Sequence, residues 1–135
     1  MNIYTATKYE RADELRVHNE HIRSLGHTIT HDWTIYESSK LADESLDARH
    51  MAGMADFAGV MQADLLIYWD HPNANGARWE AGMAAARGIP IWLVEYTNLV
   101  IFDVLPQVED VGTWHQVFFR LSQQPRTLVW AGSYV

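Results

Sequence analysis

Short apolar runs alternate along this chain with longer stretches that carry apolar residues at helical spacing. Runs of four to eight apolar and β-branched residues predict strands, and period-3.6 stretches predict helices. The predicted strands are residues 2–7, 27–30, 65–69, 91–94 and 99–104. The predicted helices are residues 12–25, 45–63, 77–87 and 110–123. Because strands that alternate with helices build a parallel sheet covered on both faces, the pattern predicts an α/β protein.

We expect one domain spanning residues 1–135, because this length is enough for a single core. The expected architecture is a flavodoxin-like or Rossmann-like three-layer sandwich. Its sheet has five mainly parallel strands in the order 2-1-3-4-5. In such sheets ligands bind beyond the carboxyl ends of the strands, where the strand order reverses. That rule selects the loops 5–11, 31–33 and 70–76 as the walls of the site.

Composition narrows the possible partners. The formal net charge of −7 makes the chain a poor candidate for binding a nucleic-acid polymer. A neutral nucleoside, or a mononucleotide at a local cluster of basic residues, remains possible. No apolar run approaches the roughly 18 residues of a membrane span, and we expect no signal peptide. The absence of cysteine fits a reducing cytoplasm.

Two acidic residues, Asp56 and Glu80, bracket the apolar run 65–69. Glu80 follows Gly76 by four residues and is expected in the first turn of its helix, where the helix dipole favours an ionised carboxylate. Such a carboxylate at a crevice can act as a nucleophile, although Glu is also favoured in first turns for capping alone. Asp56 lies on a stripe of small residues, and therefore either faces a partner or pocket or is simply solvated.

Other residues near the predicted crevice have both a binding and a purely structural interpretation. Tyr4 can orient a carboxylate from the first strand, or fill the core with its hydroxyl satisfied. Lys8 and Arg11 can meet a 5′-phosphate, or be ordinary surface charges. Trp33 and Trp69 can stack on a base, or pack in the core. The sequence alone leaves each pair of readings open.

Metal and cofactor motifs are not found in this sequence. The seven histidines do not have the spacing of a metal site, so we expect no metal ion. There is no GxSxG, no P-loop and no GxGxxG, and we expect no cofactor. Carboxylate chemistry is the main remaining candidate.

Several segments together resemble the nucleoside 2-deoxyribosyltransferase family, which includes the deoxynucleoside 5′-monophosphate N-glycosidases. The similarity covers about residues 1 to 96 and depends on the order of the segments and on the 24-residue gap from Asp56 to Glu80. The segments are Ile3-Tyr4, Leu25-Gly26-His27, Thr30-His31-Asp32-Trp33, Ala63-Asp64-Leu65-Leu66-Ile67 and Gly76-Ala77-Arg78-Trp79-Glu80-Ala81-Gly82.

The resemblance implies roles for particular residues. Glu80 matches the nucleophile, Asp56 the active-site aspartate, and Tyr4 the tyrosine that contacts the nucleophile. The loop residues Asn73, Asn75 and Gly76 are then expected to bind substrate. The family forms homodimers or higher oligomers, and some members contribute a C-terminal tyrosine to a neighbouring site, which points to Tyr134.

The implied reaction is cleavage of the N-glycosidic bond of a 2′-deoxynucleoside through a covalent deoxyribosyl-Glu80 intermediate, with the sugar passed to another nucleobase. The position six before the nucleophile is commonly Asp in the nucleoside transferases and Ser in the nucleotide hydrolases, but here it is Ala74. The sequence therefore leaves open a transferase, a nucleotide N-glycosidase that uses water, and a nucleotide-binding module without turnover.

Overall fold

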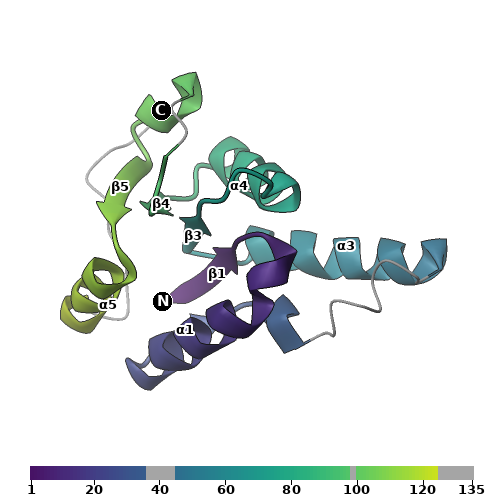
Figure 1. Ribbon diagram of the computed structural model, residues 1–135, viewed down its shortest axis with the longest axis horizontal. Helices are drawn as coiled ribbons and strands as arrows, with labels where there is room; N and C mark the ends of the chain where they lie inside the picture. Colours follow the sequence, from purple (N-terminus) through teal and green to yellow (C-terminus); the bar gives the residue numbers. More distant parts are fainter. Residues whose placement is uncertain (36–44, 98–99, 125–135) are drawn as a thin grey trace.

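A five-stranded sheet forms the centre of the protein, and every neighbouring pair of strands in it is parallel (Figure 1). The structure is a computed structural model that describes residues 1–35, 45–97 and 100–124. The strand order is β2-β1-β3-β4-β5, as predicted. The strands are β1 (Asn2–Ala6), β2 (Thr28–Ile29), β3 (Leu65–Trp69), β4 (Ile91–Val94) and β5 (Val108–Gly112).

Helices cover the sheet on both faces and complete three layers. On one face α1 packs beside α5, and on the other α3 packs beside α4 (Figure 1). The helices are α1 (Ala12–Ser24), α3 (Leu46–Met61), α4 (Asn75–Arg87) and α5 (Trp114–Gln123). In the described connections lie the short 3-10 helices η1 (Tyr9–Arg11), η2 (Trp33–Ile35) and η3 (Ile101–Val104).

The core lies where apolar strands are covered on both sides. All five residues of β3 and all four of β4 are buried. This is the burial expected of continuous apolar runs in a parallel sheet, and it confirms the α/β prediction. Gly88 ends α4 in the left-handed conformation, with φ of 76°, where a side chain would be disfavoured.

The last strand and the last helix are shifted from their predicted positions. The prediction of a strand at 99–104 is wrong where the structure describes that segment, because residues 101–104 form η3. The fifth strand is 108–112, and the helix predicted from Asp110 begins at Trp114, after the N-cap Thr113. Within β5, Glu109 and Asp110 are exposed and Val111 is buried. An edge strand with so few buried positions carries no apolar run to reveal it.

Two other differences concern the helices on the α3/α4 face. Helix α4 begins at Asn75 rather than at residue 77, so Glu80 lies in its second turn and not its first. The apolar residues of α3 are also not all buried, since Met54 and Phe57 are exposed whereas Val60 is fully buried. Within the described ranges no helix combines the length and the apolar character needed to cross a membrane.

Candidate active site

A cavity of about 470 Å³ opens at the carboxyl ends of the first strands, between α3 and α4. Its walls come from the predicted crevice loops after β1, β2 and β3 and from the facing sides of the two helices. Asp56 from α3 and Glu80 from α4 both line it. The structure therefore brings together two carboxylates that lie 24 residues apart in the sequence.

Tyr4 and Glu80 form a hydrogen bond at the floor of this cavity. Tyr4 is fully buried in β1, and its hydroxyl donates to Glu80 Oε2. Burial, followed by the charges of Glu80 and Asp56, raises the pKa of Tyr4, so the phenol stays protonated as a donor.

The ionisation of Glu80 differs from the sequence prediction. The pKa of Glu80 is raised to about 8, and burial is the largest cause. The Tyr4 hydrogen bond lowers this pKa, and the negative charge of Asp56 raises it. The expectation that the helix N-terminus keeps Glu80 ionised is therefore wrong for the unliganded protein at neutral pH. Desolvation exceeds the dipole because Glu80 lies beyond the first turn, where the dipole effect has largely decayed.

Asp56 has a basic partner. Its Oδ1 lies 3.3 Å from Nε2 of His31, which follows β2. Burial raises the pKa of Asp56, and the proximity of His31 opposes that rise.

The close approach of α3 to β1 and to the end of β2 depends on Gly59. A Cβ on Gly59 would lie 2.7 Å from His31 Cβ and 3.1 Å from the Tyr4 ring. Thr30 Oγ1 donates to the Gly59 carbonyl at 2.7 Å, which ties the end of β2 to the helix. Asp56 is three residues earlier and therefore lies on the same face of α3.

The fold and this geometry can be compared with known proteins. No protein-family model matches the chain, and no curated protein matches it in sequence. Several solved structures match in fold, and two of them are enzymes of known activity. One is a 2-deoxyribosyltransferase from the psychrotolerant bacterium Bacillus psychrosaccharolyticus, with 20% identity over 87% of this chain and 90% of that chain, at a TM-score of 0.66. The other is the CMP N-glycosidase BcmB of Clostridium botulinum, with 17% identity over 90% of this chain and 98% of that chain, at a TM-score of 0.57.

This chain has the deoxyribosyltransferase and N-glycosidase fold. The structural likeness confirms, at the level of the fold, the resemblance drawn from the sequence segments. At these identities the likeness assigns no role to any individual residue.

Five of the expected substrate-binding residues line the cavity of this deoxyribosyltransferase fold. They are Lys8, Trp33, Asn73, Asn75 and Gly76. The Lys8 ammonium is 3.8 Å from the carboxylate of Glu10. The Trp33 ring stacks on Tyr9 with centroids 5.6 Å apart, and its Nε1 donates to the Thr5 carbonyl at 2.8 Å, so it is held firmly in the wall.

Arg11 and Trp69 lie outside the residues that line this cavity. Arg11 donates to the Asp70 carbonyl at 2.8 Å, and its guanidinium lies 4.4 Å from the centroid of the Trp69 ring. Trp69 donates through Nε1 to Glu95 and packs edge-on against Trp114, on the α1/α5 face. Because side chains alternate along a strand, the last residue of β3 points away from the α3/α4 face. Tyr134 lies outside the described residues.

Some cavity residues were not selected from the sequence. Glu10, Phe57, Trp79 and Met83 line the cavity, and His31 contacts Asp56 behind its wall. His31 is in one of the loops that the strand-end rule selects, so its position was predictable although its contact was not. Among the described residues, no group of three or more His, Asp or Glu side chains is placed to hold a metal ion.

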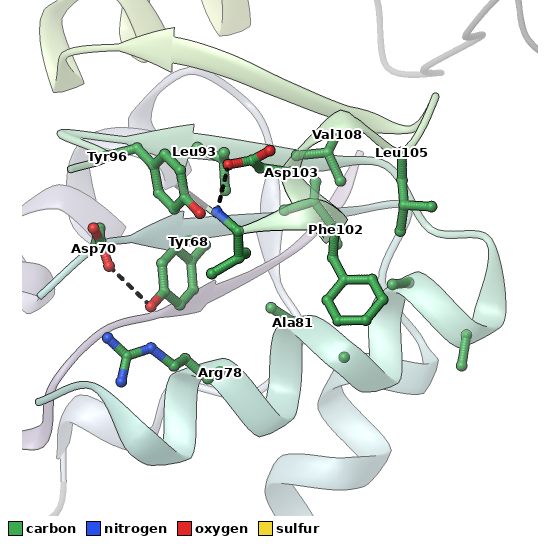
Figure 2. A pocket seen from close by; sticks show the side chains of 15 residues that line it. Tyr68, Asp70, Arg78, Ala81, Leu93, Tyr96, Phe102, Asp103, Leu105 and Val108 are labelled. Atoms are coloured by element: carbon green, nitrogen blue, oxygen red, sulfur yellow. Dashed lines mark hydrogen bonds between the residues drawn. The ribbon is translucent and has the colours of Figure 1, made fainter. Parts of the chain in front are cut away.

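A second cavity, of about 670 Å³, lies on the other side of α4, against β4 and η3. Figure 2 shows Tyr68 and Tyr96 side by side near Asp70, and Phe102 extending from η3 toward α4. At the polar end of this second cavity two lining residues are hydrogen-bonded to each other, since the Tyr68 hydroxyl donates to Asp70 at 3.0 Å. The second cavity is larger, but the converging carboxylates are in the first, which is therefore the candidate active site.

Proposed function

We propose that this protein cleaves the N-glycosidic bond of 2′-deoxynucleosides and passes the sugar to a second nucleobase, with Glu80 as the nucleophile. The observation that carries the proposal is the hydrogen bond from Tyr4 to Glu80 in a cavity shared with Asp56. The cavity volume lies within the roughly 300–1,000 Å³ typical of small-molecule sites. The fold of the deoxyribosyltransferase and N-glycosidase structures supports the same reaction class.

In the first step an oxygen of ionised Glu80 bonds to C1′ of the sugar while the bond from C1′ to the base nitrogen breaks. The electron pair of that bond goes to the base, which takes up a proton as it leaves. Asp56 is the group placed to give that proton or to hold the sugar, since burial raises its pKa. The anionic side chains stabilise the positive charge that develops on the sugar ring.

In the second step a nitrogen of an incoming base bonds to C1′ and gives its proton to Asp56, and Glu80 departs as a carboxylate. Water in place of the base gives free deoxyribose, and the same residues serve both outcomes. The second candidate, an N-glycosidase with water as acceptor, is favoured by the structural likeness to the CMP N-glycosidase.

The charges of the cavity favour a nucleoside over a nucleotide. Among the described residues that line it, Lys8 is the single Lys or Arg, against the acidic residues Glu10, Asp56 and Glu80. Lys8 is already close to Glu10, and Arg11 is engaged with the Asp70 carbonyl and the Trp69 ring. A phosphate dianion would meet net repulsion there, whereas a neutral nucleoside would not.

The resemblance also leads us to propose a homo-oligomer. Apolar side chains of η3 are exposed beside the second cavity, including Ile101 at 78% and Phe102 at 65%, and Trp79 of α4 is 75% exposed on the wall of the first cavity. Clustered exposed apolar groups of this kind are typical of protein–protein contact surfaces.

The test is to mix the protein with 2′-deoxyinosine and free adenine and to separate the products by chromatography. Formation of 2′-deoxyadenosine together with hypoxanthine supports the transferase. Hypoxanthine with free deoxyribose alone supports the N-glycosidase. If neither appears, with deoxyinosine or with deoxynucleoside monophosphates, the catalytic proposal is wrong and a binding module without turnover takes its place.

A further inference from the structure

His31 lies at the point where the end of β2 meets α3. Its Nε2 is buried and lies 3.3 Å from Asp56 Oδ1, and the two side chains are 21% and 35% exposed. The contact joins residues from different layers of the fold, 25 positions apart in the sequence.

The local packing holds His31 against the helical turn that carries Asp56. The hydrogen bond from Thr30 to the Gly59 carbonyl fixes the backbone directly before His31. The absence of a side chain at Gly59 leaves the room that His31 Cβ occupies. The imidazole is therefore confined beside the carboxylate by contacts on both sides of it.

We propose that His31 is the positioning residue of Asp56, orienting its carboxylate toward the sugar and controlling which of the two cavity carboxylates holds the proton. The inference rests on the proposed function and names a residue that acts through Asp56 and does not touch substrate. Each cavity carboxylate then has its own positioning residue, because Tyr4 orients Glu80 and His31 orients Asp56.

The charged and titratable groups around Asp56 define how this control works. His31 faces it from the end of β2, Tyr4 from β1 and Glu80 from α4, with Lys8 and Glu10 on the cavity wall. A neighbouring imidazole favours the ionised form of Asp56 and so opposes the effect of burial on its pKa. An ionised Asp56 in turn raises the pKa of Glu80. Removing His31 therefore favours protonated Asp56 and ionised Glu80.

A double-mutant cycle on base release from 2′-deoxyinosine tests the inference. The assay is run above about pH 8, where Glu80 is ionised with or without His31. There His31→Ala should lower kcat/KM by roughly 10- to 100-fold, mainly through kcat, because a misdirected catalytic group costs rate more than binding. In the Asp56→Asn background the same substitution should change kcat/KM by less than about threefold, because its target is already removed. His31→Gln, which keeps a donor and similar bulk, should recover most of the activity.

Equal losses in both backgrounds would mean a general structural role and would overturn the inference, as would full activity of His31→Ala. His50→Ala is the matched control, since His50 is exposed on the same helix and does not line the cavity. It should leave kcat/KM unchanged.

A measurement without substrate separates this inference from the proposed function. The side-chain carboxyl carbon of Asp56 is followed by NMR as pH is varied, in the native protein and in His31→Gln. The midpoint should move to higher pH in the variant, because the imidazole that favours ionised Asp56 is lost. If the midpoint shifts but the protein releases no base, the proposed function is wrong and the role of His31 beside Asp56 is still supported. If the midpoint does not shift, the role proposed for His31 is wrong.

Discussion

The protonation of Glu80 is decided by burial against two weaker effects. Its helix begins at Asn75, so Glu80 lies outside the first turn, and the dipole does little there. The Tyr4 hydroxyl favours the carboxylate, but the cavity wall and Asp56 raise the pKa of Glu80 to about 8. At neutral pH the proposed nucleophile is therefore mostly in its protonated, unreactive form.

The pH dependence of activity follows from this value. Because only the carboxylate of Glu80 can attack C1′, kcat/KM should rise as pH increases and level off above about 8. Tyr4→Phe removes the hydrogen bond that favours the carboxylate, so the midpoint should move to higher pH. The loss at neutral pH should be roughly 10- to 100-fold, from the roughly 1.5–3 kcal/mol of a hydrogen bond to a charged group.

The pH profile of Tyr68→Phe provides the control for that experiment. Tyr68 also donates its hydroxyl to a buried carboxylate, that of Asp70, but it lines the second cavity. Its profile should match the native one. A Tyr4→Phe profile with an unmoved midpoint would argue against the coupling between Tyr4 and Glu80.

Stability should change with pH in the opposite direction to activity. The folded protein holds the Glu80 proton up to about pH 8, whereas an unfolded Glu loses it near 4.5, so raising pH between these values lowers the free energy of unfolding. Glu80→Gln removes this dependence. Its Tm should exceed the native value by several degrees at about pH 9, and by much less at about pH 4.

Thermal unfolding at the two pH values gives the comparison directly. Glu14→Gln, exposed on α1, is the matched control and should change Tm little at either pH. A Glu80→Gln variant that is less stable than the native protein at about pH 9 would contradict a buried Glu80 carboxylate with a raised pKa.

Which residues meet at the site was more predictable than how they are oriented. The residue patterns left a structural alternative for each of Tyr4, Asp56 and Glu80, and it was the family resemblance that placed the three in one site. The direction of Trp69 was not predictable, because a one-residue difference in strand register exchanges the two faces of a sheet. The expected role of Arg11 depended on that direction, and the partnership of His31 with Asp56 depended on the packing of two distant elements.

Among the secondary-structure elements, the contact between α3 and β1 sets the geometry of the site. Gly59→Ala should destabilise the protein by about 1–3 kcal/mol and lower activity, because its Cβ would collide with His31 and press on the Tyr4 ring. Gly53→Ala, on the same helix, meets nothing within 4 Å and should stabilise by roughly 0.5–1 kcal/mol through helix propensity. Urea unfolding of both variants measures the contrast, and similar effects of the two substitutions would show that α3 does not depend on this close approach.

Elements with a strong apolar pattern were predictable, and those at the edge of the sheet were not. Strands β3 and β4 are buried throughout, so their continuous apolar runs identified them. Strand β5 is an edge strand with exposed acidic residues, and η3 carries exposed apolar residues whose sequence resembles the apolar run of a strand. In both cases the position of the segment in the tertiary fold, and not its local sequence pattern, decided which secondary structure it forms.

In the whole molecule, the alternation of strands and helices predicted a parallel sheet covered on both faces, and the strand order was predicted with the flavodoxin-like architecture. Assembly is a separate matter. If the surface formed by η3 and α4 mediates the proposed homo-oligomer, light scattering after size-exclusion chromatography should give a multiple of the 15.5 kDa chain mass. Phe102→Asp should shift the protein toward monomer, because a buried unpaired charge would then face the partner.

The control for assembly is Val17→Asp, which places the same charge at an exposed position on α1, away from the second cavity. It should leave the mass unchanged. A native protein that remains monomeric at high concentration would contradict the proposed assembly.

The central claim is that Glu80 is the nucleophile, and the rate of base release by Glu80→Ala tests it most directly. Native protein and variant are given 2′-deoxyinosine at about pH 8, and free hypoxanthine is measured over time. The account predicts a loss on the order of 10³-fold or more, since no other group would replace the attacking carboxylate. Release at the native rate by a folded Glu80→Ala protein would contradict it.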